Sequence, residues 1–150
     1  MRKKLKLSFL LSALIAVTAG VAISYAQRID QPLPPALSRL SEAKLAEIKD
    51  EAGQVVLSGE FTTISDTKTE IERAATLTGP GGVTGAKGLA EIELVKSGDT
   101  FSKQELEVGV EGLARAANFK LLVDGAEVIT FTTNKNGKAA MKFSDKNAKK

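Results

Sequence analysis

The chain of 150 residues lacks cysteine, histidine and tryptophan altogether. Without cysteine there is no disulfide framework, no thiolate nucleophile and no thiolate-bound metal. Without histidine there is no Ser-His triad, no imidazole base and no imidazole-bound copper, zinc or haem. We therefore expect a protein that is not an enzyme, with no catalytic residues, no cofactor-binding residues, no metal ligands and no cofactor.

The first 26 residues have the three parts of a secretory signal peptide. Four basic residues precede an apolar run from Leu7 to Ile23, and the small residues Ser24 and Ala26 suit a cleavage site before Gln27. The alternative is an uncleaved membrane anchor, because the apolar run is near the shortest length that spans a bilayer. A signal peptide at 1–26 predicts a bacterial protein of the periplasm or the medium, which meets the membrane only through this segment.

Charge is unevenly distributed once this segment is removed. The remaining chain has 17 basic and 18 acidic residues, so the basicity of the whole sequence belongs to the export signal and predicts no nucleic-acid binding. Residues 134–150 carry six lysines against one aspartate. The basic tail at 145–150 is either a solubilising end or a contact for an anionic lipid or polymer.

Residues 27–53 are predicted to form a Pro-rich spacer and one short helix. Pro32, Pro34 and Pro35 favour an extended chain, because proline fixes φ and restrains the residue before it. A helix is expected from Ala36 to Ala52, with a thin stripe that includes Leu37, Leu40, Lys44 and Ile48. Such a helix either packs over the end of a sheet or binds a partner.

Residues 54–144 are predicted to form an all-β domain. Apolar and polar residues alternate with a period of two, which is typical of half-buried antiparallel strands. The predicted strands are 55–64, 69–77, 88–95, 101–110, 118–123, 127–133 and 139–143. This pattern favours a small antiparallel β-sandwich of about seven strands, immunoglobulin-like, with an incomplete barrel as the alternative.

Glycine-containing dipeptides mark the expected turns. Asp124-Gly125 and Asn136-Gly137 each lie between two predicted strands, and both suit the positive φ values of tight hairpins. The longer stretch from Gly79 to Gly85 lacks the Gly-Lys-Ser/Thr ending of a phosphate-binding loop. It is interpreted as a mobile loop, with a ligand cradle as the alternative.

The stretch from Leu106 to Phe143 resembles a repeat unit of exported bacterial β-sandwich proteins. It contains a Val-x-Gly-Leu corner at 110–113, Val-Asp-Gly at 123–125 and Asn-x-x-Gly at 134–137. It is also distantly similar to the chordin-type (CHRD-like) module. The resemblance implies an extracytoplasmic β-sandwich without a defined activity. Chordin-type and copper–zinc dismutase sandwiches usually carry histidine near these strands, and this sequence has none, so the resemblance implies no metal role here.

Five carboxylates are expected on the outer face of two neighbouring strands, namely Glu91, Glu93, Glu105, Glu107 and Glu111. Like charges opposite each other repel, and a bound Ca²⁺ would relieve that repulsion. The alternative is a solvated face that Lys103, Lys120 and Lys142 partly neutralise. Asn134, Asn136 and Gly137 mimic part of a calcium loop, but a hairpin turn explains them better.

The composition and pattern together predict a non-enzymatic exported protein with a structural or binding role at the cell envelope. Its expected partners are a protein or an envelope polymer. A second hypothesis is a subunit of an extracellular fibre, in which residues 27–53 reach into a neighbour by strand exchange. A weak calcium-binding module is the third.

Overall fold

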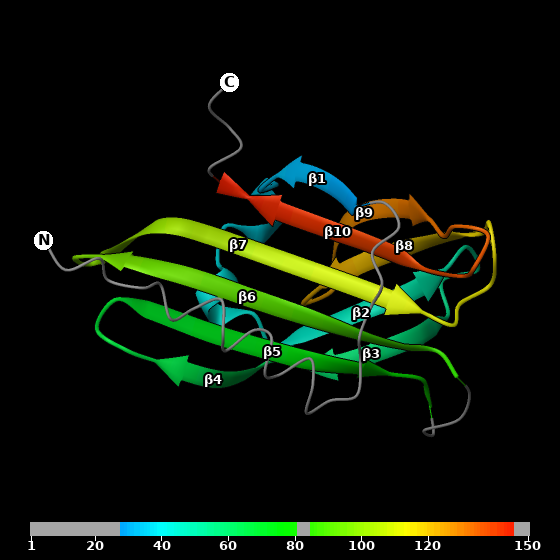
Figure 1. Ribbon diagram of the computed structural model, residues 1–150, viewed down its shortest axis with the longest axis horizontal. Helices are drawn as coiled ribbons and strands as arrows, with labels where there is room; N and C mark the ends of the chain where they lie inside the picture. The colour runs from blue at the N-terminus through cyan, green and yellow to red at the C-terminus, as the bar shows by residue number, and fades with distance from the viewer. Residues whose placement is uncertain (1–27, 81–84, 146–150) are drawn as a thin grey trace, which may run out of the picture.

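The computed structural model describes residues 28–80 and 85–145, which form an all-β protein (Figure 1). The predicted signal peptide and residues 146–150 of the predicted tail lie outside the described residues. Two short 3₁₀ turns occur, η1 (Pro35–Leu37) and η2 (Leu40–Glu42). The strands are β1 (Arg28–Pro32), β2 (Leu45–Asp50), β3 (Val55–Glu60), β4 (Thr62–Asp66), β5 (Glu70–Thr78), β6 (Lys87–Ser97), β7 (Thr100–Glu111), β8 (Asn118–Val123), β9 (Ala126–Thr132) and β10 (Ala139–Ser144). The predicted all-β class is confirmed.

The strands form one curled sheet in the order β1-β10-β7-β6-β5-β3-β2-β8-β9, with β4 paired to β5 off this path. The pairing of β1 with β10 is parallel and the other pairings are antiparallel, so the sheet is mixed. The described chain thus has ten strands, where the sequence predicted about seven. A separate two-layered, immunoglobulin-like sandwich stays a prediction.

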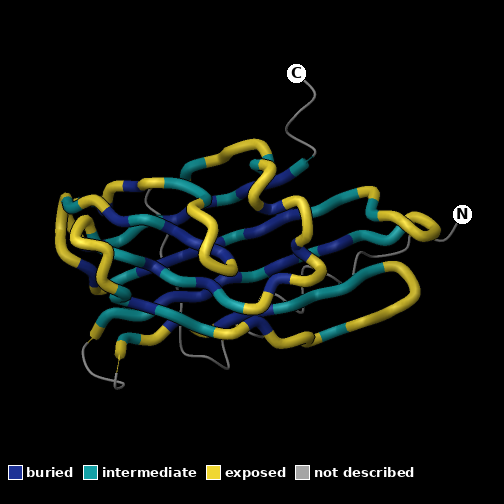
Figure 2. Tube along the Cα trace, turned by 180° about the vertical axis from the view of Figure 1, so that it is seen from behind, coloured by how far each residue is buried: buried dark blue, intermediate teal, exposed yellow. Residues whose placement is uncertain are grey.

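All seven predicted strand segments form strands, because their alternation matches the pleat of a sheet with one buried face. The segment 55–64 contains β3 and most of β4. In β6 and β7, the alternating residues Ile92, Leu94, Leu106 and Val108 are buried, as expected. Figure 2 shows buried residues running along the middles of the strands, with exposed residues concentrated in the turns at their ends.

The predicted helix from Ala36 to Ala52 is wrong. The structure has only η1 and η2 in its first part and the strand β2 in its second part. β2 pairs with β3 on one side and with β8 on the other. Residues 45–50 also alternate with a period of two, and this pattern prevails because backbone pairing on both sides outweighs weak helix propensity. The predicted boundary between 53 and 54 therefore falls inside the sheet.

The chain changes direction at Phe61, between the end of β3 and the start of β4. β3 pairs mainly with β2 and meets β5 only at Ser58, whereas β4 continues along β5. Gly59 lies against the β5 backbone so closely that an added Cβ would overlap the carbonyl oxygen of Thr76. This glycine is needed because any side chain would push the two strands apart.

Arg73 of β5 fixes the 3₁₀ segment to this corner. Its guanidinium donates to the carbonyl oxygen of Ser41 at 3.1 Å and lies 5.9 Å from the centre of the Phe61 ring. The neighbouring residues Leu37 and Leu40 are each only 1% exposed. Two of the residues predicted to line a helical stripe are therefore buried, although no helix forms.

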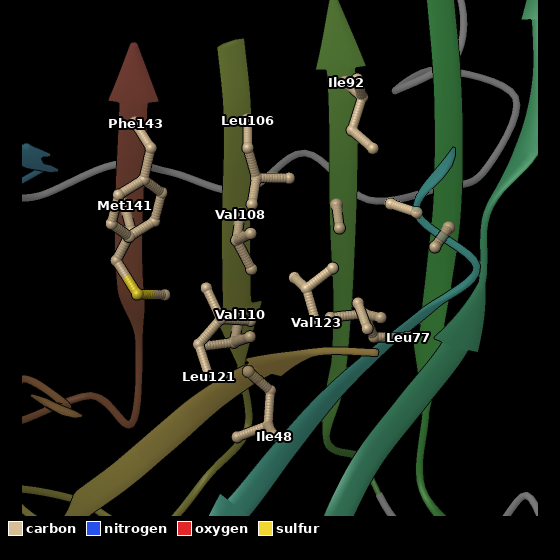
Figure 3. Packing of buried hydrophobic residues seen from close by; sticks show 14 of the residues in the cluster. Ile48, Leu77, Ile92, Leu106, Val108, Val110, Leu121, Val123, Met141 and Phe143 are labelled. Carbon is tan, nitrogen blue, oxygen red and sulfur yellow. The ribbon is translucent and has the colours of Figure 1, made fainter. Parts of the chain in front are cut away.

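One hydrophobic core fills the inside of the curl (Figure 3). Ile48 of β2 and Leu121 of β8 point toward Val110 of β7, so strands from both ends of the sheet order share this core. Met141 and Phe143 of β10 extend it. Burial of this shared apolar surface is the main contribution to the free energy that holds β2 and β8 against β7 and β10.

The two glycine-containing turns differ from each other. Asp124 and Gly125 have φ values of 50° and 80°, and they join the paired strands β8 and β9. This confirms the predicted tight hairpin. Among Asn136 and Gly137, only the glycine has positive φ, and β9 and β10 are not neighbours in the sheet. The second predicted hairpin is therefore wrong: the chain turns there but crosses to the other end of the sheet order.

Candidate functional site

The strand register places carboxylates opposite one another on the outer face of β5, β6 and β7. Glu93 lies between Glu72 on one side and Glu105 on the other, and Glu91 lies opposite Glu107. We call these residues, together with Glu70 at the start of β5, the carboxylate ladder. The structure therefore brings together four of the five predicted carboxylates, and adds two from β5 that sequence reasoning missed.

Two lysines lie between the carboxylates of this ladder. The Lys103 ammonium is 2.9 Å from Glu93 and 3.2 Å from Glu105. The Lys142 ammonium is 2.7 Å from Glu105 and 2.8 Å from Glu107. Of the three lysines expected to neutralise this face, Lys103 and Lys142 do so, whereas the third, Lys120, pairs with Glu127 on β9.

Among the described residues, Glu70, Glu72 and Glu91 form no ion pair with a lysine, although the charge of Lys103 partly opposes the rise in the pKa of Glu70. Burial, and then the neighbouring Glu93, raise the pKa of Glu70 and of Glu72. Burial, and then Glu107, raise the pKa of Glu91. Within the described chain, one buried oxygen each of Glu70 and Glu72 has no hydrogen-bond partner. This side of the ladder therefore holds protons more readily than an isolated glutamate does.

Glu105 differs from these residues because both lysines contact it. Burial alone would raise its pKa, but the hydrogen bond from Lys142 and the charge of Lys103 outweigh burial and lower it. The same contacts raise the pKa values of Lys103 and Lys142, although burial opposes this. The β7–β10 side of the ladder is consequently a salt-bridged network, and the β5 side is an excess of negative charge.

The expected calcium ligands do not converge on one point. Glu111 lies apart from the ladder and contacts Lys87 at 3.1 Å and Lys138 at 3.6 Å. The side chain of Asn134 accepts backbone hydrogen bonds from Asn136 and Lys138, so it closes its own turn. Across residues 28–80 and 85–145, no group of three or more acidic side chains is arranged to hold a metal ion.

An open groove of about 700 Å³ lies at the end of the sheet where β2 turns into β3. Its walls come from the β2–β3 turn, from the ends of the loop between β5 and β6, and from the loop between β7 and β8. Most of its lining side chains are apolar, among them Val55, Val56, Pro80, Leu113, Ala117 and Phe119. Residues 81–84 of the predicted mobile loop lie outside the described residues.

The two carboxylates that line the groove both accept hydrogen bonds from other groups of the protein. Asp50 accepts a hydrogen bond from the backbone N–H of Gln54 at 2.9 Å, which closes the β2–β3 turn. Glu51 accepts one from the side-chain amide of Asn118 at 2.9 Å. The groove therefore offers a mainly apolar wall, and each of its two acids accepts a hydrogen bond from within the protein.

The loop from β7 to β8 is held in an unusual conformation beside this groove. Ala116 has a φ of 48°, which costs energy for a residue with a side chain. The buried Thr133 compensates, since its hydroxyl bonds to the backbone of Ala114 and Ala117. Sequence reasoning missed this groove because its residues are far apart in the chain and only the curl of the sheet gathers them.

In the described part of the chain, no helix is long and apolar enough to cross a membrane. Comparison of the sequence and of the fold with known proteins gives no family, no characterised relative and no solved structure that matches.

Proposed function

We propose that this chain is a non-enzymatic exported protein that binds another envelope protein through the apolar groove at the loop end of the sheet. The observation that carries this proposal is the composition of the groove, whose two carboxylates are both engaged in structural hydrogen bonds. A surface of this kind can bury apolar side chains of a partner, and each of its two carboxylates already accepts a hydrogen bond from the protein.

The groove favours a protein segment over a sugar polymer. Sugar-binding sites use aromatic platforms, and the groove contains one aromatic side chain, Phe119, which is 4% exposed. Apolar walls instead suit the side chains of an extended or helical peptide. The proposed location, periplasm or medium, rests on the signal-peptide pattern of residues 1–26.

Binding to envelope material tests this proposal. Mature protein, residues 27–150, is mixed with washed envelope membranes and, separately, with purified peptidoglycan, and its sedimentation is measured. We expect co-sedimentation with the membranes that is lost when they are first treated with protease, and none with peptidoglycan. Co-sedimentation with peptidoglycan alone would contradict the choice of partner.

Two groove variants locate the binding surface. Ala52→Asp and Ala114→Asp place a charge on exposed groove positions, so they should weaken co-sedimentation at least tenfold and leave the melting temperature unchanged. Ser102→Asp, on an exposed position toward the opposite end of β7, is the matched control and should bind like the parent. Equal binding by all three variants would contradict the groove as the site.

A fibre subunit assembled by strand exchange is the second candidate. The position of β1 favours it, because this five-residue strand is mostly exposed and pairs only with β10 at one end of the sheet order. A strand so placed could pair with β10 of a neighbour. Filaments in electron micrographs of concentrated mature protein would support this candidate, and a discrete particle of one size would contradict it.

A further inference from the structure

Three strands of the described chain have a strand partner on one side only: β1, β4 and β9. Such edges invite pairing with another chain unless the sequence protects them. β1 is five residues long, ends in Pro32, and carries Arg28 and Asp30, whose side chains are 2.9 Å apart. β4 is also five residues long, has a register shift between Thr63 and Ser65, and ends in Asp66. Both edges are therefore protected.

The β9 edge carries fewer of these protective features, although the 3₁₀ turn η1 lies close to this strand. It is seven residues long, and six consecutive residues, Val128 to Thr133, carry no charge and include no proline. The register shift in its pairing with β8 leaves Ile129 to Thr132 regularly paired. The one charged residue, Glu127, is engaged within its own chain, since Lys120 lies 3.2 Å away and the Thr130 hydroxyl donates to it at 3.1 Å.

We propose that β9 pairs in an antiparallel manner with β9 of a second copy, around a twofold axis that passes between the two Thr130 residues. Opposite residues in an antiparallel pair lie on the same face of the sheet. In this register Thr130 meets Thr130 on the outer face, and Ile129 meets Phe131 of the second copy on the core face. Threonine pairs and aromatic–β-branched pairs are both favourable across strands.

The three edges together predict a closed dimer and not a fibre. A contact that uses the same surface on both copies satisfies itself and leaves no open β9 edge. Further growth would need a second unprotected edge, and both β1 and β4 are protected. Since a single strand pair buries less surface than a permanent dimer does, the dimer should be weak and depend on concentration.

Disulfide trapping tests the register directly. Because the sequence has no cysteine, a chain with the single substitution Thr130→Cys can form a disulfide only between two copies. With dissolved oxygen as the oxidant, we expect this variant to form a covalent dimer at least tenfold faster than Thr63→Cys, an exposed control on the β4 edge. Equal rates at the two positions, or faster trapping at Thr63, would overturn the proposal.

The solution mass of the mature chain gives the second measurement. The parent should rise from the monomer mass toward twice that mass as its concentration increases. Thr130→Lys places like charges opposite each other across the axis, so this variant should stay monomeric, whereas Thr63→Lys should behave as the parent. A parent that is monomeric throughout, or a Thr130→Lys chain that still dimerises, would overturn the proposal. Neither measurement involves the groove, so this inference and the proposed function can fail independently.

Discussion

Two regions of the sheet share one core but are stabilised in different ways. The long-strand half consists of β5, β6 and β7, which have nine, eleven and twelve residues, and the short-strand half consists of β2, β3, β8 and β9, which have six or seven. The long-strand half carries opposed carboxylates in register on its outer face. The short-strand half carries fewer carboxylates there, although Lys49 of β2 lies opposite Lys120 of β8. Contacts at a turn and at a corner hold its strands in place. The two halves thus differ in the number of opposed acidic residues and in their use of such local contacts.

The largest expected effect comes from the corner that joins the two halves. Gly59→Val should lower the free energy of unfolding by about 3 kcal/mol, because the new side chain overlaps the β5 backbone at Thr76. Urea unfolding of the mature chain measures this change. Ser58→Val, the neighbouring position on the outer face of β3, is the control and should change the free energy by less than about 0.5 kcal/mol. Similar losses for both would mean that close approach at Gly59 is unimportant.

The next effect concerns an anchor of the short-strand half. The Asp124 carboxylate accepts hydrogen bonds from the backbone N–H groups of Lys44 and Leu45, both at 2.9 Å, so the β8–β9 turn holds the start of β2. Asp124→Ala should cost about 2 kcal/mol, because two donors lose a charged acceptor and alanine resists the positive φ. Asp124→Asn keeps an acceptor and tolerates this backbone, so chemical denaturation should show a smaller loss. An Asn variant as unstable as the Ala variant would argue against the hydrogen bonds.

A smaller effect on stability is expected from two lysines: Lys142 of β10, which pairs with the long-strand half, and Lys120 of the short-strand half. Lys142→Met removes a partner of Glu105, which is 7% exposed, and should cost about 1 kcal/mol after allowance for solvent screening. Lys120→Met removes an exposed pair of the short-strand half and should cost less than about 0.5 kcal/mol. Thermal unfolding of both variants gives the comparison. Equal losses would show that the ladder network is no stronger than a surface ion pair.

The smallest effect is a dependence of stability on pH. Because the folded pKa values of Glu70, Glu72 and Glu91 are raised, the folded chain binds more protons, and its stability should rise as pH falls from neutral toward 4.5, the ordinary glutamate value. The lowered pKa of Glu105 acts in the opposite direction, since the stability it contributes above 4.5 is lost as pH falls further, through its folded pKa. The melting temperature should therefore be highest at mildly acidic pH.

A single substitution at the ladder tests the origin of this dependence. Glu72→Gln removes the repulsion from Glu93, so it should stabilise the fold by a few tenths of a kcal/mol at neutral pH and flatten the rise toward acid. Melting curves at a series of pH values measure both effects. Glu60→Gln, an exposed position at the end of β3, is the control and should leave the rise unchanged. A rise that is equally steep in the Glu72→Gln chain would assign the dependence to other groups.

Much of the fold was predictable because strands with one buried face impose a period of two on the sequence. The alternation from Glu91 to Leu94 and from Leu106 to Val110 correctly predicted which residues of β6 and β7 are buried. The dipeptide Asp124-Gly125 correctly predicted the turn between β8 and β9. The helix prediction failed because residues 45–50 fit both periods. Only pairing with β3 and β8, which are distant in sequence, decides between them.

The candidate sites likewise have features that the sequence predicts and features that only pairing between distant strands decides. Alternating glutamates were visible in the sequence, so an acidic outer face could be predicted, and so could the lysines near it. Which carboxylates oppose each other depends on the register between strands. That register is set by the buried face and by turn lengths, and it added Glu70 and Glu72 while leaving Glu111 apart.

The sequence by itself determined the all-β class, most strand positions, the tight turn at Asp124-Gly125 and the absence of thiol and imidazole chemistry. These features follow from composition and from neighbours in the chain. Only the tertiary structure decided the conformation of residues 36–52, the formation of the groove from three separate loops, and which strands lie at the edges of the described sheet. Each of these depends on contacts between residues far apart in the chain, and the curl of the sheet around one core selects those contacts.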